Sequence, residues 1–143
     1  MIASESGSSE WTWRVNVACD AIAIAQGEGE AGLIRQMHAI LCAAPPEVAA
    51  VLGLPCAGSR IDELLAAAAP REAAFQLIGR SGYMLSRSPA GPVVATIFAG
   101  DLLHETSAEA PSEAIALCAA LAEGLRDWAA RNGSAAWRRR AAH

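Results

Sequence analysis

His38 and Cys42 are the first residues whose types and spacing could do chemistry. They lie four positions apart in a segment that predicts a helix, so their side chains share one face and could bind the same metal ion. Two further ligands would have to come from Cys56, His104 or an acidic residue. A buried cysteine beside a partly buried histidine gives the same pattern without a metal, and zinc sites usually show closer ligand pairs. We therefore expect no metal and no other cofactor, and keep His38 and Cys42 as the residues to test if a metal is found.

Asp101, His104 and Glu105 form a second group, around a turn and the strand expected after it. A histidine between carboxylates could act as a general base. Side-chain alternation along that strand places His104 and Thr106 on one face and Leu103 and Glu105 on the other. The solvent-exposed face of an antiparallel sheet explains the same residues without catalysis. We predict no catalytic residue, and treat Asp101, His104 and Glu105 as the candidate lining of a small-ligand site.

Tryptophans near the two ends of the chain are candidates for contact with another protein. Trp11, Trp13 and Trp137 lie where a monomer could leave them partly exposed, and tryptophan is enriched at protein interfaces. Alternatively, the N-terminal segment packs onto the rest of the fold and buries Trp11 and Trp13. Trp128 belongs to the apolar stripe of the expected last helix and is assigned to the core.

The elements that must position these residues begin with a helical half. Residues 1–9 are expected to be a disordered tail. Residues 10–26 fit both a strand and a helix, and their alanine-rich continuation favours the helix. Apolar spacing and proline or glycine boundaries predict further helices. They cover residues 30–44, 47–52, 61–69 and 71–78.

The second half of the chain predicts a β-meander followed by a long helix. Strands are expected at 83–87, 93–98 and 102–107, separated by turns rich in proline and glycine. A helix is expected over 112–131, with its charges arranged to suit the helix dipole. The fold class is therefore α+β: an N-terminal helical half, then a three-stranded antiparallel meander covered by the C-terminal helix. One domain over 10–133 and a basic flexible tail over 134–143 complete the organisation.

One stretch resembles a module of small phage and prophage proteins, the phage ABA-sandwich domain. The matching residues are Thr106-Ser-Ala-Glu-Ala-Pro111 followed by Ala114-Ile-Ala-Leu-Cys-Ala-Ala-Leu121, within residues 82–125. The resemblance implies an α-β-β-α arrangement and brings no catalytic residues. The order of helix, three strands and helix is also similar to the double-stranded-RNA-binding fold. That fold binds RNA with a basic start to its last helix, and here the start carries Glu109 and Glu113.

Composition and charge exclude several classes of function. The 143 residues carry eleven arginines, no lysine and fifteen acids, a net charge of −4. Nucleic-acid binding needs a basic surface, and the basic cluster Arg138-Arg139-Arg140 lies in the expected tail. The longest stretch without a charged residue, 88–100, is too short to span a bilayer. The four cysteines form no C-x-x-C pair, and we expect them reduced in the cytoplasm.

Together these observations favour a small cytoplasmic protein that is not an enzyme and acts by protein–protein contact. Its partner is not identified by the sequence, and a homodimer is a plausible assembly because a sheet covered on one face must hide its other face or keep it polar. We expect neither a nucleic-acid nor a membrane partner. The competing hypothesis is a ligand-binding or metal-binding sensor or enzyme that uses His104, Asp101 and Glu105, or His38 and Cys42.

Overall fold

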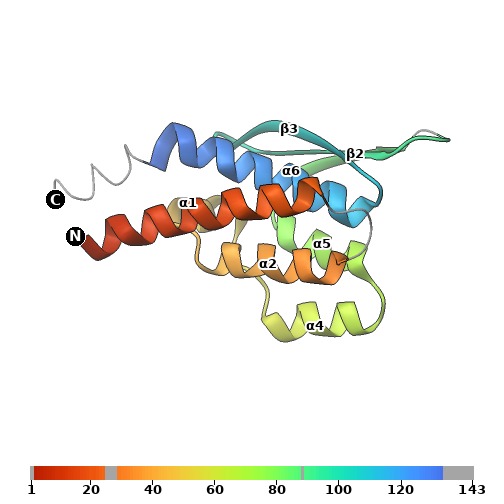
Figure 1. Cartoon of the computed structure of the whole chain (residues 1–143), viewed down its shortest axis with the longest axis horizontal. Coiled ribbons are helices and arrows are strands. Elements are labelled where there is room, and N and C mark those ends of the chain that lie inside the picture. The colour runs from red at the N-terminus through yellow and green to blue at the C-terminus, as the bar shows by residue number, and fades with distance from the viewer. Residues whose placement is uncertain (1, 25–28, 88, 134–143) are drawn as a thin grey trace.

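The computed structural model describes residues 2–24, 29–87 and 89–133. Five helices precede a three-stranded sheet in the described part, and a sixth helix follows it (Figure 1). Their bounds are α1 Ile2–Ala23, α2 Glu30–Cys42, α3 Pro46–Leu52, α4 Gly58–Ala66, α5 Pro70–Ile78, β1 Gly82–Arg87, β2 Val93–Ala99, β3 Leu103–Ala110 and α6 Glu113–Trp128, with a π-helical turn over Ala129–Gly133. The predicted α+β class, helical half and three-stranded meander are confirmed.

The N-terminal segment is a helix to Ala23, which decides the choice left open for residues 10–26 in favour of the helix over 10–23, and residues 25 and 26 lie outside the described part. Its buried stripe runs through Trp11, Val15, Ala18 and Ile22, a helical spacing. The helix begins at Ile2, so the structure includes residues 2–9 in α1, where a tail was expected over 1–9. No proline interrupts this stretch, and the helical hydrogen bonds continue through its serines. The tail expected over 134–143 lies outside the described residues.

The sheet is an antiparallel meander in the order β1-β2-β3. β1 pairs with β2 from Gly82 opposite Phe98 to Arg87 opposite Val93. β2 pairs with β3, and this register contains a β-bulge between Ile97 and Ala99. Figure 1 shows the end of the β1–β2 hairpin projecting past the helices.

Helix α6 lies between the sheet and the other helices. It packs against β2 and β3 on one side and against α1, α2 and α5 on the other. Small residues make this double contact possible: a Cβ atom added at Gly124 would lie 3.3 Å from Cδ2 of Leu103. Ser112 caps the helix, because its Oγ accepts a bond of 3.2 Å from the Ile115 N–H. The same Oγ donates a bond of 3.0 Å to Glu30 and thereby links α6 to the start of α2.

Two tryptophans join the first helix to the rest of the core. The Trp11 indole N–H donates a hydrogen bond of 2.8 Å to the Ile40 carbonyl oxygen. Its ring meets Trp128 edge-on, with 6.1 Å between ring centroids. α1, α2 and α6 are thus connected at one buried point. None of the described helices combines the length and the apolar character needed to cross a bilayer.

Candidate functional site

The β-bulge changes the predicted arrangement of Asp101, His104 and Glu105. Two residues of β3, His104 and Glu105, face the single residue Phe98 across the bulge, and both are exposed. The expectation that Glu105 lies on the face opposite His104 is therefore wrong. Asp101 is exposed in the turn before the strand. Among the described residues no hydrogen bond or ion pair joins these three, and none of them lines the cavity described next.

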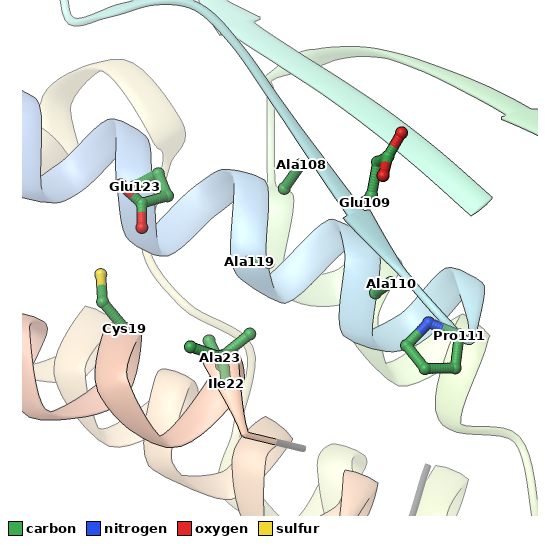
Figure 2. A pocket seen from close by; sticks show the side chains of 9 residues that line it. All are labelled: Cys19, Ile22, Ala23, Ala108, Glu109, Ala110, Pro111, Ala119 and Glu123. Carbon is green, nitrogen blue, oxygen red and sulfur yellow. The ribbon is translucent and has the colours of Figure 1, made fainter. Parts of the chain in front are cut away.

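A cavity of about 280 Å³ does lie between the helical half and the sheet, but other residues line it (Figure 2). It opens where the end of α1 faces the end of β3 and the middle of α6. Most of its lining side chains are small and apolar, and two are carboxylates. The lining consists of Cys19, Ile22, Ala23, Ala108, Glu109, Ala110, Pro111, Ala119 and Glu123.

The Cys19 thiol and the Glu123 carboxylate lie on opposite sides of the cavity. Figure 2 shows the Cys19 thiol pointing toward Glu123 across the gap between α1 and α6. Burial raises the pKa of the Cys19 thiol to about 11, and the nearby Glu123 adds to the rise. Glu123 is also bound by Arg126 at 2.5 Å, so its charge is partly neutralised. The cavity is therefore lined by small apolar side chains beside one partly neutralised carboxylate, and the thiol inside it stays protonated at neutral pH.

The sequence analysis missed this cavity because no motif marks it. Its space results from alanines on three separate elements, Ala23, Ala108 and Ala119, which meet only in the folded chain. The available clue was the composition, with 34 alanines, which shows that small residues are abundant but not where they meet.

His38 and Cys42 are brought together as the helical spacing predicts. Cys42 Sγ lies 3.8 Å from Nδ1 and 3.6 Å from Nε2 of the His38 ring. Nε2 also lies 2.7 Å from the carbonyl oxygen of Cys56, in the loop between α3 and α4. Within the ranges the structure describes, no group of three or more histidine, cysteine or acidic residues is placed to hold a metal ion. Two donors alone are too few for a structural zinc site.

The tryptophans predicted as interface residues have different locations. Trp11 is 4% exposed and bonded to Ile40, so it is not available on the surface for a partner. Trp13 is 65% exposed on the outer side of α1. Trp137 lies outside the described residues.

The face of the sheet opposite α6 carries exposed apolar side chains that the sequence analysis did not single out. On it, Met84 is 64% and Phe98 is 44% exposed. The Phe98 ring lies over Gly82 on the neighbouring strand, where a Cβ atom would come within 2.2 Å of the ring. Thr96 and Ser107 hydrogen bond to each other at 2.7 Å and keep part of this face polar. No described helix packs against this face, since α6 contacts the opposite one.

No protein-family model, no curated protein and no solved structure matches the chain.

Proposed function

We propose that this protein acts by protein–protein contact and not as an enzyme, and that its partner is a second copy of the chain bound along strand β1. The observation that carries the proposal is an unprotected sheet edge beside the exposed Met84 and Phe98. A cytoplasmic location belongs to the same proposal. The resemblance of residues 82–125 to small phage proteins extends it to a phage or prophage origin.

The two edges of the sheet differ in how well they prevent pairing. Edge strands are usually protected by charges, prolines or bulges, because their free N–H and C=O groups can pair with another strand. β3 has such protection, with a bulge and the exposed charges Glu105 and Glu109. β1 is regular along its whole pairing with β2, and Arg87 at its end is its single charged residue.

Charge also favours self-association through β1 over β3. If two β3 strands paired antiparallel about Ser107, Glu105 of one copy would face Glu109 of the other at both ends, and like charges opposite each other destabilise a sheet. If two β1 strands paired, the Arg87 side chains would lie at opposite ends of the pair. With Met84 near the two-fold axis, six residue steps of about 3.3 Å separate the two Arg87 residues by roughly 20 Å. This distance exceeds the screening length of about 8 Å at physiological salt.

Pairing through β1 would also extend the exposed apolar face. A six-stranded sheet would place Met84 of each copy near the two-fold axis, and the two Phe98 rings one strand further out. Main-chain hydrogen bonds would provide the affinity, as in other complexes formed by strand addition. The face so enlarged could then receive further protein partners.

The test is sedimentation velocity and native mass spectrometry of the untagged protein over a concentration series. We expect a monomer–dimer equilibrium in the wild type. Met84→Lys should shift it to monomer, because it places two like charges close to the axis. The matched control is His104→Lys, which adds the same charge to the same face at the other edge and should leave the dimer intact.

A wild type that stays monomeric at every concentration, or a dimer unaffected by Met84→Lys, would contradict the proposal. Loss of the dimer in both variants would instead indicate face-to-face packing of two sheets and would overturn pairing along β1. Both substituted side chains are exposed, so the variants should fold, and circular dichroism checks this.

A second candidate function, binding of a small ligand, is favoured by the cavity between α1, β3 and α6. Its alanine lining and the carboxylate of Glu123 suit a small apolar molecule with a cationic group. Native mass spectra would show such a ligand as extra mass on the purified protein. Ala119→Leu, which fills the cavity, should remove that mass, and a spectrum without extra mass would count against this function.

A further inference from the structure

The exposed face of the sheet combines apolar and acidic side chains. Met84 of β1 and Phe98 of β2 form its apolar part. β3 adds two carboxylates, because Glu105 lies opposite Phe98 across the bulge and Glu109 pairs with Val94. Both carboxylates are exposed, and neither forms an ion pair with a described residue. This face therefore suits an occupant that is both apolar and positively charged.

The last described residues of the chain lie beside one end of this face. Arg131 Nη2 donates a hydrogen bond of 3.4 Å to the Leu102 carbonyl oxygen, in the β2–β3 turn. Phe98 lies in β2 just before the same turn. The turn is unobstructed, since nothing lies within 4 Å of a Cβ atom added at Gly100. A chain that continues past Gly133 can thus pass over this turn from the α6 side of the sheet to the exposed face.

The ten residues that follow have the composition this face requires. They are Ser134-Ala-Ala-Trp-Arg-Arg-Arg-Ala-Ala-His143, and they lie outside the described part of the chain. One large apolar side chain, Trp137, is followed directly by three arginines. Four residues of extended chain beyond Gly133 reach up to about 14 Å, and seven reach about 24 Å. The tryptophan can therefore meet the end of the face near the turn, and the arginines can lie further along it.

We propose that residues 134–143 dock on the exposed face of the sheet in the same chain. Trp137 packs on Met84 and Phe98, and the arginines bind the two carboxylates of β3. Attachment to the same chain gives the segment an effective concentration of about millimolar, so weak contacts are enough. The docked segment covers the apolar face, and another protein partner can use that face only after displacing it. This proposal does not depend on pairing along β1, which joins strand edges and leaves the face free.

The experiment is fluorine NMR of the full chain labelled with 5-fluorotryptophan, in which each of the four tryptophans gives its own resonance. The signal lost in Trp137→Phe assigns Trp137, and the exposed Trp13 serves as an internal reference. We expect the Trp137 resonance to differ from that of a labelled synthetic peptide of residues 134–143. Raising the salt from about 0.1 M to about 1 M shortens the screening length from about 10 Å to about 3 Å, and should move the resonance toward the peptide position.

Two exposed side chains test where the segment docks. Met84→Ala and Glu105→Gln should each move the Trp137 resonance toward the peptide position, because one removes apolar contact and the other a charge. The matched controls are Leu54→Ala and Glu72→Gln, which remove an exposed apolar side chain from the α3–α4 loop and an exposed carboxylate from α5. Both controls should leave the resonance where it is in the wild type.

Three results would overturn the proposal. The first is a wild-type Trp137 resonance at the peptide position, which would show that the segment is not docked. The second is a docked resonance that neither face variant moves, or that the controls move equally, which would place the segment elsewhere. The third is a shift that grows with protein concentration, which would show docking on another copy. Circular dichroism of every variant confirms that it is folded.

Discussion

Replacing Gly79 with alanine should destabilise the protein far more than the same replacement at Gly100. Both glycines occupy the second position of a four-residue turn closed by a hydrogen bond from the fourth residue to the first, 3.0 Å long in each turn. Both have a positive φ, 57° at Gly79 and 50° at Gly100, which side-chain-bearing residues rarely adopt. The backbone strain of an alanine is therefore similar at the two sites. The difference in stability between the two variants then measures the contacts made by the added methyl group.

The surroundings differ at the added methyl group. At Gly79, which joins α5 to the sheet, a Cβ atom would lie 2.3 Å from the carbonyl oxygen of Leu52 at the end of α3. At Gly100, in the β2–β3 turn, nothing lies within 4 Å of it. The Leu52 oxygen also accepts the Arg80 N–H at 3.0 Å, so moving it away from the methyl group weakens the hydrogen bond that ties α3 to the start of the sheet.

These contacts give the expected magnitudes. Alanine at a left-handed position costs about 1–2 kcal/mol, and the stiffer unfolded chain returns about 0.4–1 kcal/mol of this. Gly100→Ala should therefore cost about 1 kcal/mol or less. At Gly79 the collision adds a packing cost of about 1–3 kcal/mol and the weakened hydrogen bond about 1 kcal/mol. The free energy of unfolding of Gly79→Ala should thus lie about 2–4 kcal/mol below that of Gly100→Ala.

Urea unfolding followed by tryptophan fluorescence measures both values, because Trp11 and Trp128 are buried and report on the core. The two variants should show the same dependence on urea concentration as the wild type and differ in midpoint. If both lose the same stability, the Leu52 carbonyl does not constrain Gly79, and the account of this junction is wrong.

Three further predictions concern the core. Trp11→Phe removes the bond to the Ile40 carbonyl and should cost about 1–3 kcal/mol in urea unfolding, whereas Trp13→Phe on the exposed side of the same helix should stay within about 0.5 kcal/mol of wild type. Ser112→Ala removes both the N-cap of α6 and the bond to Glu30 and should cost about 1–3 kcal/mol by the same assay, a loss that Ser112→Thr should largely restore because its hydroxyl can make both bonds. The pKa values of Cys19 and Cys118 are raised above 9.0 in the folded state, so the stability that their protonated forms contribute is complete below pH 9.0 and is lost as the pH rises through about 11 and about 12. Melting temperatures across this range should fall less steeply for Cys118→Ala than for the wild type, and an unchanged slope would contradict the assignment.

Elements with strong local patterns could be predicted from the sequence. The helix expected over 112–131 and the strands expected at 83–87 and 93–98 correspond to α6, β1 and β2, because proline and glycine turns separate them clearly. The helix expected over 61–69 is observed as Gly58–Ala66, three residues earlier. It begins at Gly58 without a side-chain cap, so no capping residue marks its start in the sequence.

Features that depend on contact between distant segments could not be predicted. Alternation along β3 gave the wrong face for Glu105, because one inserted residue at the bulge reverses the order of faces and leaves no trace in the composition of the strand. Trp11 has the same residue type and nearly the same position as Trp13. Once the segment is a helix, its apolar stripe buries Trp11 and leaves Trp13 outside. The partner of the Trp11 indole, the Ile40 carbonyl, lies 29 residues away in the chain and could not be predicted. The pair of His38 and Cys42 was found because both lie on one helix, whereas the Cys56 carbonyl that orients His38 comes from another segment.

Small residues account for both the tight packing of α6 and the cavity beside it. Near its C-terminal end, α6 approaches β3 so closely that a single methyl group at Gly124 would lie 3.3 Å from Leu103. Near the middle of α6, Ala119 faces the end of α1, where Ala23 is too short to reach across. Small side chains permit close approach where two elements run together, and they leave space where they face each other across a wider gap. A larger residue at position 23 or 119 should therefore fill the cavity without disturbing the contact between α6 and the sheet.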